Sequence, residues 1–303
     1  TGTITTNTAA TLGQLDTISG HIDAGTFAAP VDITDANATL TTNTNDWLAT
    51  ATGTVTINNV ATLAEIDTIN AHVDNGTTVA TAITDATATL ATNTNDWLAT
   101  ATGTITTNTA ATLGQLDTIN GHIDAGTLSY SAISDTATNL SANTSGFVTG
   151  SVDVTITGSV NVTQLKAINA LTLGGITLNV TNDSLFGTAS DLAAAFAGTV
   201  TTHTGTVIIT DEPTVGQLKT INDATSGAIT LADTNGTLSG SASDLVDAFD
   251  GTITGYEGNI TVTGAASLSQ LDAIDSATTG TITVADITDA NATLTTNTND
   301  WLA

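Results

Sequence analysis

Residues 52–101 read TGTVTINNVATLAEIDTINAHVDNGTTVATAITDATATLATNTNDWLATA, and related segments follow one another six times along the chain. The first half of each copy carries three aliphatic residues spaced three apart: Leu12, Leu15, Ile18; Leu63, Ile66, Ile69; Leu113, Leu116, Ile119; Val162, Leu165, Ile168; Val215, Leu218, Ile221; and Leu268, Leu271, Ile274. One aromatic residue recurs in the second half: Trp47, Trp97, Phe147, Phe196, Phe249 and Trp301. A fixed period of this length is typical of supersecondary units that bury their apolar faces against their neighbours.

Each copy combines two strand patterns with two helix patterns. Residues 52–57 alternate threonine with aliphatic residues, as a half-buried strand does, and residues 63–69 place their aliphatic residues on one side of a short helix. A second strand is expected at 79–83, and residues 90–97 form a second helical stripe. Strands joined by helices should be parallel neighbours. We therefore predict an α/β, β-helix-like repeat solenoid with β-α-β-α in each copy. A mainly-β solenoid is the alternative, because Thr and Asn are weak helix formers.

The period also predicts the domain organisation. We expect one solenoid of six repeats, at 1–51, 52–101, 102–151, 152–203, 204–257 and 258–303. Residues 33–49 return unchanged at 287–303, and no polar capping repeat of the kind that ends isolated solenoids is visible. We therefore expect the segment to be a window of a longer array that continues covalently or by end-to-end stacking.

The composition is strongly acidic. Asp and Glu number 29 against two bases, Lys166 and Lys219, and the formal net charge is −27. Such a chain repels nucleic-acid phosphates and anionic lipids, and cations must screen or bind it in a compact state. No run of about 18 apolar residues occurs, so membrane insertion is not expected.

Oxygen-rich runs at 43–46, 93–96 and 297–300 are the candidate metal sites. Ca²⁺ takes about six to eight oxygen ligands, and the runs offer these amide and carboxylate groups: Asn45, Asp46, Asn95, Asp96, Asn299 and Asp300. The EF-hand spacing is missing, and the third copy carries Asn-Thr-Ser-Gly at 143–146 instead. A loop or frayed helix end explains the runs equally well, so Ca²⁺ stays one of two interpretations.

Other recurrent polar positions have simpler interpretations. A Ser/Thr-Asp pair, such as Thr84-Asp85, precedes the second helix pattern of every copy and is interpreted as a helix N-cap. The residue after the second helical aliphatic is Asp in four copies and Lys166 or Lys219 in the other two, which indicates an exposed, non-catalytic position. The aromatic residues are expected to stack in the core, with an exposed carbohydrate platform as the alternative.

The sequence carries no recognisable catalytic signature. A P-loop, a dinucleotide-binding glycine motif after a strand and a Gly-x-Ser-x-Gly elbow are all missing from it. We therefore predict a protein that is not an enzyme and has no catalytic or cofactor-binding residues.

Three phrases resemble the repeats of a known group of proteins. They are Thr-Val-Gly-Gln-Leu-Lys-Thr-Ile-Asn (214–222), Gly-Ala-Ile-Thr-Leu (227–231) and Leu-Ser-Gly-Ser-Ala-Ser-Asp-Leu (238–245). They are similar to repeats in very large surface proteins of cyanobacteria and other aquatic bacteria, described as β-strand-repeat, adhesin-like or S-layer-like. The resemblance implies an extracellular or cell-surface location and a structural or adhesive role.

The leading functional hypothesis is a structural segment of an extracellular filament, sheath or surface layer, assembled by stacking of repeats. Its expected partners are further copies of itself, end to end or laterally, together with cations or surface glycans. The alternative is the stalk of a giant surface adhesin. A third hypothesis is ice binding, because Thr-x-Thr recurs at 1–5, 52–56 and 102–106, although later copies break this pattern.

Overall fold

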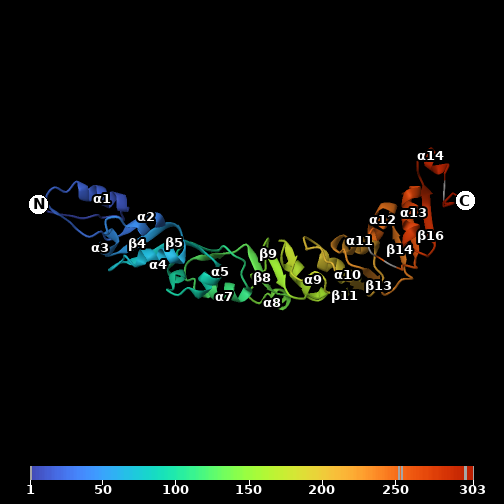
Figure 1. The fold of residues 1–303 in the computed structure, drawn as a ribbon, viewed down its shortest axis with the longest axis horizontal. Helices are drawn as coiled ribbons and strands as arrows, with labels where there is room; N and C mark the ends of the chain where they lie inside the picture. Colours follow the sequence, from blue (N-terminus) through green and yellow to red (C-terminus); the bar gives the residue numbers. More distant parts are fainter. Residues whose placement is uncertain (1, 252, 254, 297–298, 303) are drawn as a thin grey trace. The chain divides into compact units, whose positions relative to one another are not determined.

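The computed structural model describes residues 2–251, 253, 255–296 and 299–302. The chain divides into two compact units, Thr1–Ile133 and Ser134–Ala303. Helices and strands alternate along the sequence in both units (Figure 1). Each unit is described below by itself.

The first unit contains short helices between parallel strands. Its elements are β1 (Thr3–Ile4), α1 (Leu12–Gly20), β2 (Thr26–Phe27), β3 (Ile33–Asp35), α2 (Asn37–Thr42), α3 (Trp47–Thr50), β4 (Thr54–Ala61), α4 (Leu63–Asn70), β5 (Thr77–Asp85), α5 (Thr87–Thr92), α6 (Trp97–Thr100), β6 (Thr104–Thr107), α7 (Leu113–Gly121) and β7 (Thr127–Ser129). β1 pairs with β2, and β3 to β7 form a five-stranded sheet in sequence order. Its neighbouring strands are parallel, with Ile33 beside Val55 and Val55 beside Thr78.

The second unit repeats this organisation in smaller sheets. Its elements are β8 (Ala132–Thr136), which begins at the end of the first unit, α8 (Ala137–Ala142), β9 (Asp153–Thr157), α9 (Val162–Leu171), β10 (Ile176–Leu178), β11 (Leu185–Gly187), α10 (Ala189–Phe196), β12 (Val207–Ile209), α11 (Val215–Ala224), β13 (Ile229–Leu231), β14 (Thr237–Gly240), α12 (Ala242–Phe249), β15 (Asn259–Ala266), α13 (Leu268–Ala277), β16 (Ile282–Ile287) and α14 (Asn291–Leu294). The sheets are β10-β9-β8, β11-β12-β13 and β14-β15-β16. The predicted α/β class with parallel neighbouring strands is therefore confirmed, as several short sheets alternating with helices.

The first helix of each copy is defined by its N-terminus. In α4, the Thr62 side chain accepts a hydrogen bond from the Glu65 backbone N–H, and the Glu65 carboxylate accepts one from the Thr62 backbone N–H. The same capping box begins α1, α7, α9, α11 and α13. This reciprocal arrangement satisfies backbone donors that a helix start leaves unpaired, so short helices form in a sequence with little intrinsic helix preference.

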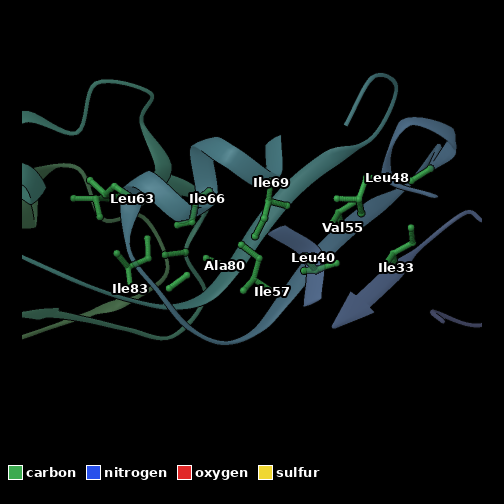
Figure 2. Packing of buried hydrophobic residues seen from close by; sticks show 14 of the residues in the cluster. Ile33, Leu40, Leu48, Val55, Ile57, Leu63, Ile66, Ile69, Ala80 and Ile83 are labelled. Atoms are coloured by element: carbon green, nitrogen blue, oxygen red, sulfur yellow. The ribbon is translucent and has the colours of Figure 1, made fainter. Parts of the chain in front are cut away.

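The aliphatic residues of these helices form the core. In the first unit, Ile66 and Ile69 of α4 are fully buried and lie over Ile57 and Ile83 of the sheet (Figure 2). Full burial of one such side chain contributes about 1.5–3 kcal/mol. The spacing of three that the sequence shows is therefore the core face of the helix.

The recurrent aromatic residue does not form the expected core stack in most copies. Trp47 is only partly buried, whereas the next residue, Leu48, is fully buried. Trp97 and Leu98 are arranged in the same way. Of the six aromatic positions, Phe196 alone belongs to the buried core, at 3% exposure. In the first two copies the expectation fails because the second helix is broken just before the tryptophan.

That break lies between α5 and α6, where one continuous helical stripe was expected. Asn93 and Asp96 both adopt left-handed backbone conformations, with φ of 36° and 58°, which Asn and Asp tolerate better than most residues. The Asn93 side chain donates to Asp96 Oδ1 at 3.0 Å and accepts from the Leu98 backbone N–H at 3.3 Å. The turn changes the direction of the chain. As a result, Leu98 is buried in the core, and Trp97 packs at the edge of the core and stays partly exposed.

The Ser/Thr-Asp pairs do not act as the predicted N-caps. In the second copy the N-cap of α5 is Ala86, which has no side-chain cap bond. Asp85 instead accepts from two backbone N–H groups, that of Ala86 at 2.8 Å and that of Leu63, at the start of α4, at 3.1 Å. In the fourth and fifth copies, Thr188 and Ser241 are the N-caps, ahead of their pairs. The aspartate thus links two helix starts that are distant in sequence.

Glycines mark the closest backbone approach between consecutive turns of the chain. A Cβ atom on Gly76 would lie 2.5 Å from the Gly53 carbonyl oxygen, and one on Gly126 would lie 2.6 Å from that of Gly103. In the second unit a Cβ on Gly280 would likewise collide with the Gly258 carbonyl oxygen. These positions require glycine because no side chain fits between the stacked backbones.

Candidate functional site

The candidate metal residues form hydrogen bonds within their own loops and to the first helix of the same copy. Asn45 donates through Nδ2 to Asp16 Oδ1 at 2.6 Å, and Asp46 accepts from Asn43 Nδ2 at 3.1 Å. The equivalent bonds join Asn95 to Asp67 at 2.6 Å, Asn93 to Asp96 at 3.0 Å and Asn299 to Asp272 at 2.6 Å. Asp300 has a left-handed backbone, with φ of 57°. Residues 297 and 298 of the third run lie outside the described residues.

This geometry does not gather the six candidates into a common set of ligands. Asn45 and Asn95 each present the amide nitrogen to a carboxylate on the first helix of their copy, α1 or α4, while each loop aspartate that accepts a bond does so from a different asparagine. Within the described ranges, no group of three or more His, Cys, Asp or Glu residues could hold a metal ion. Loop structure thus accounts for the runs, and Ca²⁺ binding by them stays a prediction.

The same helix carboxylate also holds the tryptophan. Trp47 Nε1 donates to Asp16 Oδ1 at 2.6 Å, and Trp97 Nε1 donates to Asp67 Oδ1 at 2.6 Å. Trp301 and Asp272 form the third such pair at 2.8 Å. One carboxylate oxygen therefore accepts from an indole and an amide at once. Hydrogen bonds to an ionised acceptor are stronger than neutral ones, and they fix the indole against the helix.

Electrostatics agree with this arrangement in the first copy. Hydrogen bonds from the indole of Trp47 and then from the amide of Asn45 hold the pKa of Asp16 below its ordinary value. Both donors favour the ionised carboxylate, so Asp16 stays charged in moderately acidic solution.

In the fourth and fifth copies a lysine occupies the aspartate position. Lys166 Nζ lies 2.6 Å from Asp191 Oδ1, and Lys219 Nζ lies 2.9 Å from Asp247 Oδ2 and 3.5 Å from Asp223 Oδ2. The bond from Lys166 lowers the pKa of Asp191, and the bond to Asp247 raises the pKa of Lys219. The side chains of Lys166 and Lys219 are exposed by 47% and 36%, in agreement with the prediction that this position faces solvent. The sequence interpretation did not include the contacts that the position makes with the second half of the copy.

A signal for these contacts is present in the sequence. Tryptophan occurs only in copies whose helix position is aspartate, and phenylalanine occurs in both lysine copies: Asp16 with Trp47, Asp67 with Trp97, Asp272 with Trp301, Lys166 with Phe196 and Lys219 with Phe249. The third copy departs from this pattern, because it combines Asp117 with Phe147. An indole carries an N–H donor and a phenyl ring does not, so a tryptophan at this position indicates an acceptor on the helix, whereas a phenylalanine does not indicate its absence.

A groove lies beside each of the first two tryptophans. The groove at Trp97 has a volume of ≈ 430 Å³ and is lined by α4, α5 and the loop that follows α5. The groove at Trp47 has a volume of ≈ 410 Å³ and is lined at equivalent positions by α1, α2 and their loop. The structure therefore builds one concave feature twice within the first unit.

Histidines differ between the two units. His21 and His72 lie at exposed helix ends, with Nδ1 at 2.6 Å and 2.9 Å from the carbonyl oxygens of Thr17 and Thr68. His203 is buried, with Nε2 at 2.8 Å from the Asp183 carbonyl oxygen. Burial lowers the pKa of His203 against the opposing effects of that bond and of the Asp183 carboxylate.

No family model, curated protein or solved structure matches the chain. Among the described residues, no helix has both the length and the apolar character that crossing a bilayer requires.

Proposed function

We propose that the chain is a structural repeat array whose copies stack as a solenoid and assemble into an extracellular filament, sheath or surface layer. The observation that carries this proposal is the sequential parallel pairing of strands. In the five-stranded sheet β3-β4-β5-β6-β7, strands that pair with each other are consecutive in the sequence. Such nearest-neighbour packing is the way in which repeat proteins extend by adding units.

Two further features support stacking over a ligand-centred fold. The close glycine contacts, such as Gly76 against Gly53, set the approach of consecutive turns through the backbone itself. The Asp85 carboxylate ties the starts of α4 and α5 together. Both devices join neighbouring segments, and both recur along the chain, so the same geometry can be added repeatedly.

Charge gives the proposed assembly a dependence on cations. The net charge of −27 opposes close packing of copies unless it is screened or neutralised. We propose that self-association, end to end or laterally, is favoured by high ionic strength or by Ca²⁺. The sequence resemblance to bacterial surface proteins motivates the extracellular location. We further propose that the protein is not an enzyme, because its sequence carries no recognisable catalytic signature.

Electron microscopy of the native full-length protein, with and without a chelator, tests the proposal. Regular filaments or layers whose axial repeat equals a whole number of repeat units are the expected result. Loss of order in EGTA would make divalent cations part of the assembly. Single unbranched rods with a globular tip would instead identify an adhesin stalk. A complete protein that stays monomeric by light scattering in high salt with Ca²⁺ would contradict assembly.

Ice binding, the third hypothesis, is kept as a candidate because the five-stranded sheet aligns threonines across strands. Paired neighbours are Thr34 with Thr56, Thr54 with Thr77, Thr84 with Thr106, and Thr104 with Thr127. All of these residues are at least partly exposed, and parallel strands are spaced about 4.8 Å apart. A thermal-hysteresis assay on the chain decides this candidate, with a Thr56→Val and Thr106→Val double variant as the control for the threonine rows.

A further inference from the structure

We propose that the grooves beside Trp47 and Trp97 are saccharide-binding subsites, each taking one neutral, hydroxyl-bearing sugar unit of a polysaccharide. This inference is independent of the proposed structural role, because an array can bind a glycan whether or not it forms filaments. It rests on four properties of the grooves: recurrence, lining chemistry, preorganisation and charge.

The first property is recurrence with matching residues. The lining of each groove includes a leucine, an aspartate, three threonines, an asparagine and a tryptophan: Leu12, Asp16, Thr39, Thr42, Thr44, Asn45 and Trp47 in one, and Leu63, Asp67, Thr89, Thr92, Thr94, Asn95 and Trp97 in the other. The volumes, ≈ 410 Å³ and ≈ 430 Å³, lie within the range of about 300–1,000 Å³ usual for small-molecule sites. Two such subsites on one chain suit a polymer, since linked units bind with avidity.

The second property is the chemistry of the lining. Leu63 and the indole of Trp97 supply apolar surface, and Asp67 and Asn95 supply polar groups beside it. Asp67 Oδ1 accepts from both Asn95 and Trp97, whereas Asp67 Oδ2 and Asn95 Oδ1 accept no hydrogen bond from the described residues and are open to a ligand. A pyranose ring has C–H groups on its faces and hydroxyls around its rim, so it complements an apolar wall with acceptors at the edge.

The third property is preorganisation. The two hydrogen bonds to Asp67 Oδ1, both 2.6 Å, fix the indole, the amide and the carboxylate relative to one another. The left-handed residues Asn93 and Asp96 shape the loop that carries Asn95 and leads into Trp97. A ligand therefore meets groups that need no further ordering, and this reduces the entropic cost of binding.

The fourth property is charge, which selects among ligand classes. The groove contains a carboxylate and no cationic group, and the whole chain carries −27, so anionic sugars and phosphates are repelled. A purely apolar ligand would desolvate the carboxylate without a partner, which is costly. A neutral ligand with many hydroxyl donors satisfies Asp67 Oδ2 and avoids both penalties.

Binding is measured on the full 303-residue chain. A neutral glycan array identifies the sugar, and tryptophan fluorescence then follows titration with the matching hexasaccharide, for example a cellulose or chitin oligomer. A Trp301→Phe background leaves only the two groove tryptophans, because the chain has three in all. The expected result is a saturable change in fluorescence at millimolar or lower concentration.

A pair of substitutions tests the grooves without touching the Asp–Trp contacts. Ala64 and Gly13 line the two grooves from exposed helical positions, and a Cβ on Gly13 would meet nothing within 4 Å. The Ala64→Gln and Gly13→Gln double variant fills both grooves, and the affinity should fall about tenfold or more. Gly216→Gln is the matched control, since it changes the equivalent helix position of the fifth copy, where Lys219 replaces the aspartate.

Three results would overturn the proposal. One is the absence of any array signal and of any fluorescence response up to about 10 mM, a concentration well above a 1 mM Kd worth about −4.1 kcal/mol. Another is an equal loss of affinity in the Gly216→Gln control. The third is binding confined to a cationic glucosamine oligomer and abolished by salt, which would indicate attraction to the general negative charge.

Discussion

The first two copies and the fourth and fifth copies join their helices to the following segment at the same position but with different chemistry. In the first two, Asp16 and Asp67 each accept from an indole and an amide. In the other two, Lys166 and Lys219 form ion pairs with aspartates. All these bonds span more than twenty positions of the sequence. The helix geometry therefore fixes where a polar contact forms, while its chemistry is free to change.

The two chemistries should respond differently to solution conditions. Donors on Trp and Asn are neutral and do not titrate between acid and base, so only the carboxylate of the Asp–Trp contact changes with pH. An exposed lysine–aspartate pair is screened by salt and contributes little at high ionic strength. The contact position is therefore common to these four copies, whereas the response of the contact to pH and salt differs between them.

The largest effect is expected from the feature that both regions share, the close glycine approach. Gly76→Ala places a Cβ 2.5 Å from the Gly53 carbonyl oxygen and 3.2 Å from Val73 Cγ1, so the backbones must move apart. Overpacking of this kind costs about 2 kcal/mol. Urea unfolding followed by circular dichroism should show this loss in the free energy of unfolding.

Gly114→Ala is the matched control for that prediction. Gly114 lies inside α7, and a Cβ there would meet nothing within 4 Å. Replacing a helical glycine with alanine should raise the free energy of unfolding by about 0.5–1 kcal/mol. If both variants changed stability in the same direction, the stacked glycines would not be set by close approach.

The second effect concerns His203, whose burial has no counterpart among the exposed histidines His21 and His72. Burial depresses the pKa of His203 below its ordinary 6.5, so the neutral imidazole is the form that the folded state prefers. The stability that the neutral His203 contributes to the folded state is fully present above pH 6.5. It is lost as the pH falls through the folded-state pKa. Each tenfold difference in proton affinity corresponds to about 1.4 kcal/mol.

Hydrogen exchange measured at pH 7.5 and pH 5 should therefore show faster opening of β12 and α11 at the lower pH, after correction for intrinsic exchange rates. In a His203→Gln variant the second unit is expected to be less stable at neutral pH but to lose this dependence. An unchanged dependence in the variant would assign it to other groups.

The repeat pattern predicts the parts of the fold that depend on local periodicity. The buried faces of the first helices and the parallel order of the strands follow from residues three apart and from strand–helix alternation. The break at Asn93 and Asp96 does not, because a left-handed backbone leaves no mark on hydrophobic spacing. The Asp67–Trp97 bond spans 30 positions, so it becomes visible only when copies are compared with one another.

The third prediction concerns a substitution that removes the Asp–Trp hydrogen bond but keeps an aromatic ring. Trp97→Phe removes the Nε1–H that donates to Asp67 Oδ1, as the third copy does naturally with Phe147. Loss of one such hydrogen bond should cost about 1 kcal/mol in urea unfolding. Asp67→Asn is the milder companion, because its amide oxygen can still accept from the indole. Equal stability of Trp97→Phe and the parent chain would show that the contact only positions the ring.

The smallest effect is expected from Lys219→Met, which keeps most of the side-chain stem but removes the charge that pairs with Asp247. Its effect on unfolding should be smaller than that of Trp97→Phe and should vanish at about 1 M NaCl, where the screening length is about 3 Å. Because the bond to Asp247 raises the pKa of Lys219 above its ordinary 10.5, the contribution is present below that pH and is lost as the pH rises through the raised value. Trp97→Phe should show neither dependence. An equally large effect of Lys219→Met in high salt would mean that packing of the lysine stem, and not its charge, joins the helices of the fifth copy. The Lys–Asp and Asp–Trp contacts would then differ less than their chemistry implies.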